Sequence, residues 1–223
     1  DRAVAFVEDA TAGIYLYKVP ASFAAHMVVG NTIKVTAERA AFNDLVQLNN
    51  FVSIEVTATD VVVTPTVVTD PAELFNVQGQ LISVTGYLRQ TYSGTPADFH
   101  LVTEQGTFAL RLASSNDIPG AERTAAQSKL VGVDAGTEIT VVAGAGRFRA
   151  TAQIMLFNAD QITIGDLGTD AELADVAVAH INFPEADAEV VADLTLPDEG
   201  LFGTVIEWTS SDPTVIANDG TVV

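Results

Sequence analysis

Residues 135–164, AGTEITVVAGAGRFRATAQIMLFNADQITI, repeat the pattern of residues 29–56, VGNTIKVTAERAAFNDLVQLNNFVSIEV. In both segments apolar residues alternate with polar ones, which is the pattern of a half-buried β-strand. A repeat of this length indicates two copies of one β-rich unit. Four residues recur at one constant spacing: Gly30 with Gly136, Ile33 with Ile139, Val35 with Val141 and Phe42 with Phe148.

In both copies the repeated segment follows a hairpin and a short helical stretch. Strands over 5–10 and 13–19, separated by Thr-Ala-Gly, predict the first hairpin, and residues 98–113 around Gly106 predict the second. Helix is expected within 21–29 and within 118–131, where Pro119 suits a helix start. The second copy has one more strand ahead of its hairpin, over 80–90, which ends in a Ser-Gly turn.

Strand, hairpin, helix and hairpin is the order of a five-stranded OB barrel, in which the helix lies between the third and fourth strands. The phrases AFVEDATAGIYLYK, VGNTIKVTAERAAFNDLVQL and TPTVVTDPAELFNVQGQLISVTG resemble the OB-like domains of large secreted bacterial proteins, including some extracellular nucleases. The resemblance implies a mainly β fold with OB-like domains over 1–64 and 65–168. A generic β-sandwich is the alternative for the same pattern.

The first copy begins at its hairpin, with only a few residues ahead of it. We therefore expect the first barrel to lack its first strand. The sheet edges beside residues 5–8 and 33–38 should then be open, or paired with a segment from outside 1–64. Two explanations remain open: the strand belongs to a longer natural chain, or another chain donates it and the molecules assemble into a filament.

Residues 170–223 form a third pattern: a helical stretch over 170–180, a strand around 190–196, a Pro-Asp-Glu-Gly turn and a final strand-rich segment. This part resembles the atrophied bacterial immunoglobulin-like (Ig-like) domains. The resemblance implies a partial Ig-like β-sandwich over 169–223, incomplete at its C-terminus. The matching residues are Leu194, Leu196, Pro197, Gly200, Trp208, Ser210, Ser211, Pro213, Val215, Ile216, Gly220 and Val222.

The composition excludes several classes of function. The absence of cysteine removes disulfides and thiolate catalysis. Residues 169–223 contain twelve acidic residues and no basic one, and the chain's net charge of −19 disfavours a phosphate-binding surface. No apolar run approaches the roughly 20 residues that span a bilayer, and the N-terminal residues lack signal-peptide features. We expect a secreted or cell-surface segment whose export signal lies upstream.

Two tyrosines on one strand are candidates for ligand stacking. OB barrels commonly bind nucleic acid or sugar across their second and third strands, and Tyr15 and Tyr17 alternate on the third. Aligning Gly13 with Gly106 pairs Tyr15 with the core position Phe108, whereas the alternative register pairs Ile14 with it and turns both tyrosines outward. The outward register is favoured, and it makes Ala109 and Arg111 the counterparts of the tyrosines.

The segment GAGRFR, residues 144–149, superficially suggests a phosphate loop, but it lacks the third glycine and the Lys-Ser/Thr ending. A hairpin turn that exposes Arg147 and Arg149 is the preferred interpretation, and these arginines join Arg111 as candidate ligand-binding residues. An acidic group at the second domain junction is a weak Ca²⁺ candidate, against the plainer interpretation of helix capping. It comprises Asp166, Asp170, Glu172 and Asp175.

The sequence predicts no catalytic residue, cofactor or tightly bound metal. The three histidines share no metal-ligand spacing, and no nucleophile elbow is present. We expect a non-catalytic structural or adhesive array from a larger secreted or cell-surface bacterial protein. Its partners would be other domains of that protein or copies of itself. The alternative is a set of accessory domains that bind nucleic acid or polysaccharide for an extracellular nuclease or related hydrolase.

Overall fold

The structure is a computed structural model that describes residues 2–91, 98–114, 117–182 and 190–223. The chain is mainly β and forms two compact units, residues 1–167 and 168–223. The first unit contains two β-sheets, one from each copy of the sequence repeat. The predicted Ser93-Gly94 turn lies outside the described residues, and the predicted division at residues 64 and 65 stays a prediction.

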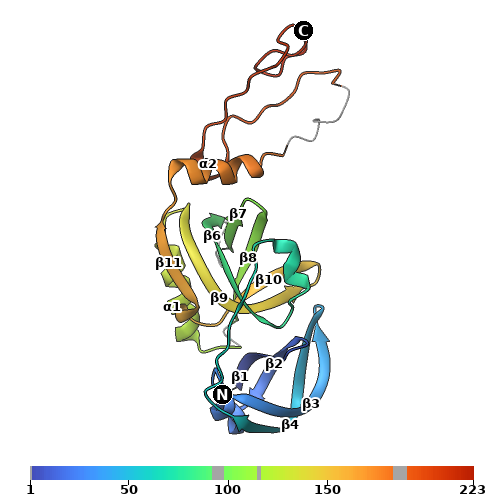
Figure 1. Cartoon of the computed structure of the whole chain (residues 1–223), viewed down its shortest axis with the longest axis vertical. Coiled ribbons are helices and arrows are strands. Elements are labelled where there is room, and N and C mark those ends of the chain that lie inside the picture. The colour runs from blue at the N-terminus through green and yellow to red at the C-terminus, as the bar shows by residue number, and fades with distance from the viewer. Residues whose placement is uncertain (1, 92–97, 115–116, 183–189) are drawn as a thin grey trace. The chain divides into compact units, whose positions relative to one another are not determined.

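The first sheet has four strands in the order β1-β2-β4-β3 (Figure 1). β1 and β2 form the predicted hairpin, β2 runs parallel to β4, and β3 and β4 form a second hairpin. The short 3₁₀ helix η1 (Ala21–His26) lies in the stretch expected to be helical. The strands are β1 (Arg2–Glu8), β2 (Gly13–Pro20), β3 (Thr32–Phe42) and β4 (Leu45–Ala58).

A two-residue turn connects β3 to β4. Asn43 and Asp44 have φ angles of 49° and 67°, the left-handed backbone that Asn and Asp tolerate better than most residues. After the turn, β4 continues without interruption to Ala58. Asn50 bends β4 through another positive φ, 49°, so the strand absorbs the irregularity without ending.

No described residue pairs with the outer edge of β1 or of β3, so the first sheet is an OB-like barrel without its first strand. The predicted edges beside residues 5–8 and 33–38 are open. In the second copy the equivalent strand is present and closes the barrel.

The second sheet contains a closed five-stranded barrel in the order β6-β7-β8-β10-β9, with β9 pairing back onto β6. β8 and β10 are parallel, and helix α1 (Gly120–Val131) joins β8 to β9, which is the OB connectivity. The barrel strands are β6 (Leu81–Thr91), β7 (Asp98–Thr103), β8 (Gly106–Leu112), β9 (Thr137–Phe148) and β10 (Thr151–Leu156).

Two further strands extend this sheet beyond the ring. β5 (Thr66–Val67) pairs with β6, and β11 (Ile162–Leu167) pairs with β9. Two 3₁₀ helices, η2 (Pro71–Phe75) and η3 (Ala159–Gln161), precede β6 and β11. The sequence pattern did not distinguish β11 from β10, because one apolar alternation runs through both.

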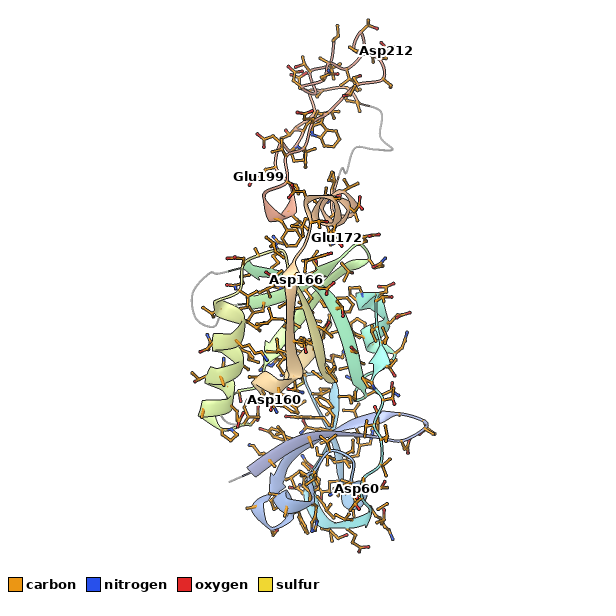
Figure 2. All side chains as sticks on the ribbon, turned by 60° about the vertical axis from the view of Figure 1, so that its left-hand side comes forward. Asp60, Asp160, Asp166, Glu172, Glu199 and Asp212 are labelled. Atoms are coloured by element: carbon orange, nitrogen blue, oxygen red, sulfur yellow. The ribbon has the colours of Figure 1, made fainter. Side chains whose placement is uncertain are left out.

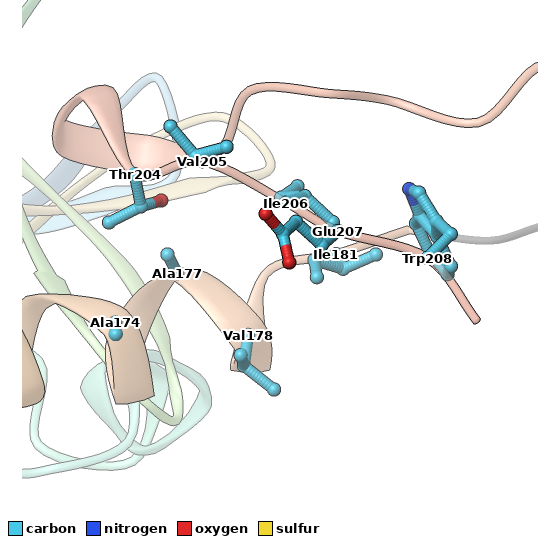
Figure 3. Close-up of a pocket in the computed structure, with 9 residues that line it drawn as sticks. All are labelled: Ala174, Ala177, Val178, Ile181, Thr204, Val205, Ile206, Glu207 and Trp208. Atoms are coloured by element: carbon cyan, nitrogen blue, oxygen red, sulfur yellow. The ribbon is translucent and has the colours of Figure 1, made fainter.

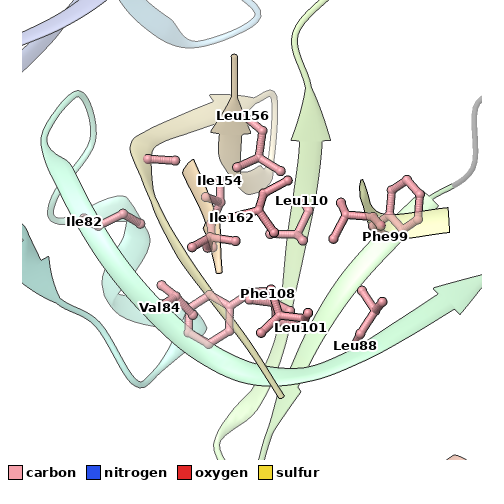
Figure 4. Close-up of a cluster of buried hydrophobic side chains, with 14 of the residues drawn as sticks. Ile82, Val84, Leu88, Phe99, Leu101, Phe108, Leu110, Ile154, Leu156 and Ile162 are labelled. Atoms are coloured by element: carbon pink, nitrogen blue, oxygen red, sulfur yellow. The ribbon is translucent and has the colours of Figure 1, made fainter. Parts of the chain in front are cut away.

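The core of the second barrel consists of alternating side chains that point into the ring (Figure 4). On β9, Ile139, Val141 and Ala143 have no exposed surface, while the intervening Thr140 and Val142 are half-buried and the preceding Glu138 is exposed. Ala126 and Leu130 of α1 contribute to the same core from the helix. This period-two burial explains why the sequence alternation located the strand correctly.

The second unit contains helix α2 (Asp170–Ala179) and the 3₁₀ turn η4 (Leu201–Gly203). The predicted strand around 190–196 is not a regular strand. Among the described residues of this unit, β-pairing is limited to isolated bridges between Glu199 and Val205 and between Ile216 and Val222. Extended segments that share only single bridges cannot build a ladder of hydrogen bonds.

Trp208 Nε1–H donates a hydrogen bond to the backbone carbonyl of Pro197 at 2.6 Å. The Trp208 side chain is half-buried. In the part of the chain that the structure describes, no helix combines the length and the apolar character needed to cross a membrane.

Candidate functional site

An aromatic cluster joins the two sheets of the first unit. The Phe6 ring of β1 is stacked on the ring of Phe157, which directly follows β10, with centroids 5.6 Å apart and planes 6° from parallel. Tyr15 of β2 lies 5.0 Å from Phe6 and 6.4 Å from Phe157 between centroids. Buried Leu45 and Met155 complete the cluster. The aromatic side chains of the first sheet therefore bind the second.

Two glycines of the GAGRFR segment make this junction possible. A Cβ on Gly144 would lie 2.0 Å from a ring carbon of Phe6, and a Cβ on Gly146 would lie 2.4 Å from the Met155 sulfur. At Gly144 the Phe6 ring leaves no room for a Cβ, whereas at Gly146 the flexible end of Met155 would have to move. The glycines that suggested a phosphate loop instead allow side chains to lie against the backbone of β9.

A second pair of glycines, Gly13 and Gly79, allows the backbone at the start of β2 to contact the backbone just ahead of β6. A Cβ on Gly13, at the start of β2, would lie 2.1 Å from the carbonyl carbon of Gly79, ahead of β6. Next to this contact, the Glu8 carboxylate accepts a hydrogen bond from the Leu81 backbone N–H at 2.8 Å. The first hairpin is thus attached directly to the start of the strand that closes the second barrel.

The β3–β4 turn makes another connection. The backbone carbonyl of Asn43 accepts a hydrogen bond from the Arg149 N–H at 2.7 Å, and the carbonyl of Asp44 accepts one from Gln78 Nε2 at 3.3 Å. The Arg147 guanidinium lies 3.9 Å from the Asp44 carboxylate. This ion pair is solvent-exposed and adds at most about 1 kcal/mol, so the backbone hydrogen bonds fix the turn.

The register of β2 follows the favoured interpretation. Ile14 pairs with Val7 as Phe108 pairs with Leu101, so Ile14 and Leu16 face the first sheet's core and Tyr15 faces away from it. Tyr15 is nevertheless only 3% exposed, because the second barrel covers it. Burial raises the pKa of Tyr15 well above its ordinary value; nearby Asp117 adds to the rise and Arg111 opposes it. A buried tyrosine cannot stack on a base or a sugar.

Tyr17 keeps part of its ring accessible beside this cluster. It is half-buried, its centroid is 6.1 Å from that of Tyr15, and the Lys18 ammonium lies 4.8 Å above its ring. Of the two predicted stacking residues, only Tyr17 still has a face that a ligand could reach.

The three predicted arginines lie over exposed phenylalanine rings. Arg111 and Arg149 both approach Phe148, with guanidinium carbons 5.9 and 5.5 Å from the ring centroid, and Arg147 lies 5.1 Å from the Phe75 centroid. Phe148 is 38% exposed and Phe75 is 44% exposed. These cation–π pairs form an accessible basic and aromatic surface, which we call the arginine–phenylalanine patch.

The phenylalanines were not among the predicted site residues. Phe148 stands between Arg147 and Arg149 in the sequence, a local signal for an aromatic–basic cluster. Nothing local marks Phe6 or Phe157 as partners, because they meet only when the two sheets associate.

The acidic candidates do not form a calcium site in the described residues, which contain no cluster of three or more His, Asp or Glu suited to a metal ion. Asp166 belongs to β11 of the first unit, whereas Asp170, Glu172 and Asp175 lie on α2 of the second. Glu172 lies in the first turn of α2 (Figure 2).

Glu172 has a structural role as the partner of Thr169 in a capping box. Its carboxylate accepts hydrogen bonds from the Thr169 N–H and hydroxyl, both at 2.8 Å, and the Thr169 oxygen accepts one from the Glu172 N–H. These bonds, the backbone one first, lower the pKa of Glu172. Helix capping is the interpretation that the geometry supports.

The second unit has a shallow apolar pocket between α2 and residues 204–208 (Figure 3). Ala177 and Val178 of α2 line one side, and Val205 and Trp208 line the other. The pocket has no charged group besides Glu207, so it lacks the converging polar atoms that orient a small ligand.

Comparison with known families identifies one part of the chain. Residues 170–223 match the family of the atrophied bacterial Ig domain. The match covers the segment for which the sequence motif predicted this domain. No curated protein matches the chain.

Solved structures offer weak similarities only. A murine DNA-binding protein bound with double-stranded DNA aligns at 12% identity and a TM-score of 0.40, covering 74% of this chain and 86% of that one. The p204 HINb domain aligns at 10% identity and 0.35, covering 73% and 83%, and the tetrameric p202 HIN2 aligns at 10% and 0.36, covering 74% and 79%. At these values the similarities do not extend to function.

Proposed function

We propose that this chain is a non-catalytic structural and adhesive module array of a larger secreted or cell-surface bacterial protein. The observation that carries the proposal is the burial of Tyr15 against Phe6 and Phe157. The strand face on which OB barrels commonly bind nucleic acid or sugar is occupied here by a neighbouring domain. Residues that could have formed a ligand platform therefore fix two domains to each other.

The Ig-type match at residues 170–223 supports the same role, because a further module follows the paired barrels in one chain. The acidic, cysteine-free composition supports an extracellular setting. In this proposal the modules act as spacers or adhesive elements. Chains could assemble into a filament if an extended segment of one molecule completes the open sheet of the next.

A second function is favoured by the arginine–phenylalanine patch. Guanidinium groups over accessible rings suit an anionic polymer, since arginine contacts phosphate or sulfate while the rings stack on bases or sugars. The patch would then make the barrels accessory domains that bind nucleic acid or polysaccharide for an extracellular nuclease or related hydrolase.

Titration separates the two functions. The chain is titrated at low salt with fluorescent single-stranded DNA and with a sulfated glycan, and anisotropy reports binding. The structural role predicts no saturable binding below about 100 μM, because the net charge of −19 repels polyanions. Micromolar binding that weakens with salt, and is lost in Arg111→Ala and Arg149→Ala but kept in Arg89→Ala, would establish the second function instead.

A further inference from the structure

The open edges of the first sheet leave its core partly uncovered. Val7 and Ile14 are half-buried, whereas their counterparts Leu101 and Phe108 in the closed barrel have no exposed surface. The same difference holds on β3, where Val35 is half-buried and its counterpart on β9 is fully buried. The exposed apolar surface lies beside the two unpaired strands.

In the second barrel, β6 covers these positions. Its residues Ile82, Val84 and Leu88 point into the core and are fully buried (Figure 4). β6 runs antiparallel to both β7 and β9, so one strand satisfies the backbone groups of two edges at once. The first sheet has the same two edges and no such strand among the described residues.

The pairing of β6 fixes the register that a completing strand would need. On β9, Ile82 pairs with Ala143, Val84 with Val141 and Gly86 with Ile139. On β7, Leu88 pairs with Leu101. Transferred through the repeat, these partners become Ala37, Val35, Ile33 and Val7 of the first sheet.

We propose that the gap between β1 and β3 is a strand-acceptor site for an extended polypeptide segment from outside residues 1–223. The segment lies antiparallel to both strands. It places apolar side chains opposite Ala37, Val35 and Val7 and a glycine opposite Ile33, with polar residues between them. This inference rests on the proposed structural role and specifies the partner that the role requires.

A separate segment fits the site better than a second copy of this chain. β6, the strand of matching pattern, already has both edges paired inside a closed barrel. A second copy would have to open that barrel to donate it and would expose the fully buried core of Ile82, Val84 and Leu88. An extended segment with no pairing of its own incurs only the ordering cost of binding.

The test uses a synthetic peptide with the sequence of residues 80–90, QLISVTGYLRQ, whose register the second barrel defines. Hydrogen exchange of the full chain is measured with and without peptide, and calorimetry gives the affinity. We expect the amides of β1 and β3 to exchange at least tenfold more slowly, with no change in β7 and β9. A control peptide with Asp in place of Val84 and Leu88 should bind at least tenfold more weakly.

Substitutions in the protein test whether the peptide binds specifically at the proposed site. Val35→Ala should weaken the peptide at least threefold, while the exposed Val52→Ala should leave its affinity unchanged. The proposal is overturned if neither β1 nor β3 gains protection, if β7 and β9 change instead, or if sedimentation shows that the chain closes these edges by dimerising. Such a result would leave the structural role intact, because the polyanion titration tests that role separately.

Discussion

The rings of Phe6 and Phe157 are stacked across the boundary between the two sheets, 5.6 Å apart and 6° from parallel. The residues lie far apart in the sequence and belong to different copies of the repeat. Together with Tyr15, Leu45 and Met155, they form a hydrophobic cluster separate from the cores of the two sheets.

Removing one ring should destabilise the first unit. Phe6→Ala should lower the free energy of unfolding by about 2–4 kcal/mol. This loss is somewhat smaller than that for a fully buried phenylalanine, because Phe6 is half-buried. Chemical denaturation measures the change. Val52→Ala is the control, since Val52 is 74% exposed and its truncation should cost no more than about 0.5 kcal/mol. Equal effects of the two changes would show that the rings do not stabilise the fold.

Stacking itself is separated from burial by a double-mutant cycle. Phe6→Leu and Phe157→Leu keep apolar volume but remove the paired rings. The double variant should be more stable than the sum of the single changes predicts, with a coupling of about 0.5–1.5 kcal/mol. A coupling indistinguishable from zero would mean that the two rings act independently.

Glycine is required where the backbone of β9 meets Phe6. Gly144→Ala places a methyl group 2.0 Å from a ring carbon of Phe6 and should lower the free energy of unfolding by about 1–3 kcal/mol through overpacking. Gly120→Ala is the matched control, because a Cβ there meets nothing within 4 Å and the position begins α1. That change should be neutral or stabilising by up to about 1 kcal/mol, since alanine favours helix. Thermal unfolding should therefore show a lower midpoint for Gly144→Ala and an unchanged or higher midpoint for Gly120→Ala. Equal midpoints would show that glycine is not required at position 144.

The buried phenol of Tyr15 makes the fold sensitive to alkali. Because burial raises its folded pKa, the folded protein holds this proton above pH about 10, where the unfolded chain releases it. The unfolded state then binds fewer protons, so stability falls as pH rises above about 10. Tyr15→Phe should reduce this alkaline loss of stability. Absorbance near the phenolate band should contain a component that appears only with unfolding and that Tyr15→Phe removes.

The capping box of α2 should make this helix less stable at acid pH, whereas Tyr15 makes the fold less stable at alkaline pH. The Thr169 hydrogen bonds hold the pKa of Glu172 below 4.5, so their stabilisation is present above that pH and is lost as pH falls through the folded pKa. The protection factors of the α2 amides, which correct for the intrinsic exchange rate at each pH, should fall on acidification, and Glu172→Gln should remove most of that fall. Added Ca²⁺ should leave the exchange unchanged; slower exchange with Ca²⁺ would restore the calcium hypothesis.

Much of the fold could be predicted because it depends on local alternation. Ile33, Val35 and their counterparts in the second copy have period-two burial, and the repeat showed which strand the first sheet lacks. The Ig-type motif was recognised, yet its strand around 190–196 was wrong, since a strand needs neighbours to pair with and sequence alternation does not supply them.

The site was harder to predict for the same reason. The direction of Tyr15 relative to its own sheet followed from the register, but its burial depends on Phe157 in another sheet. The glycines of GAGRFR had no local motif that explained them, because their partners Phe6 and Met155 come from outside the segment. Packing between domains determines these roles, and one sequence does not record it.

The central claim is that the first unit is a rigid pair of barrels joined through Tyr15, on the strand face with which OB barrels commonly bind ligands. The chain has no cysteine, so Val52→Cys on β4 and Ile164→Cys on β11 provide two unique, exposed spin-label sites. Pulsed electron paramagnetic resonance should give one narrow distance distribution, which Gly144→Ala broadens. A broad distribution in the spin-labelled protein that keeps Gly144 would contradict the claim, because two barrels on a flexible linker would produce it.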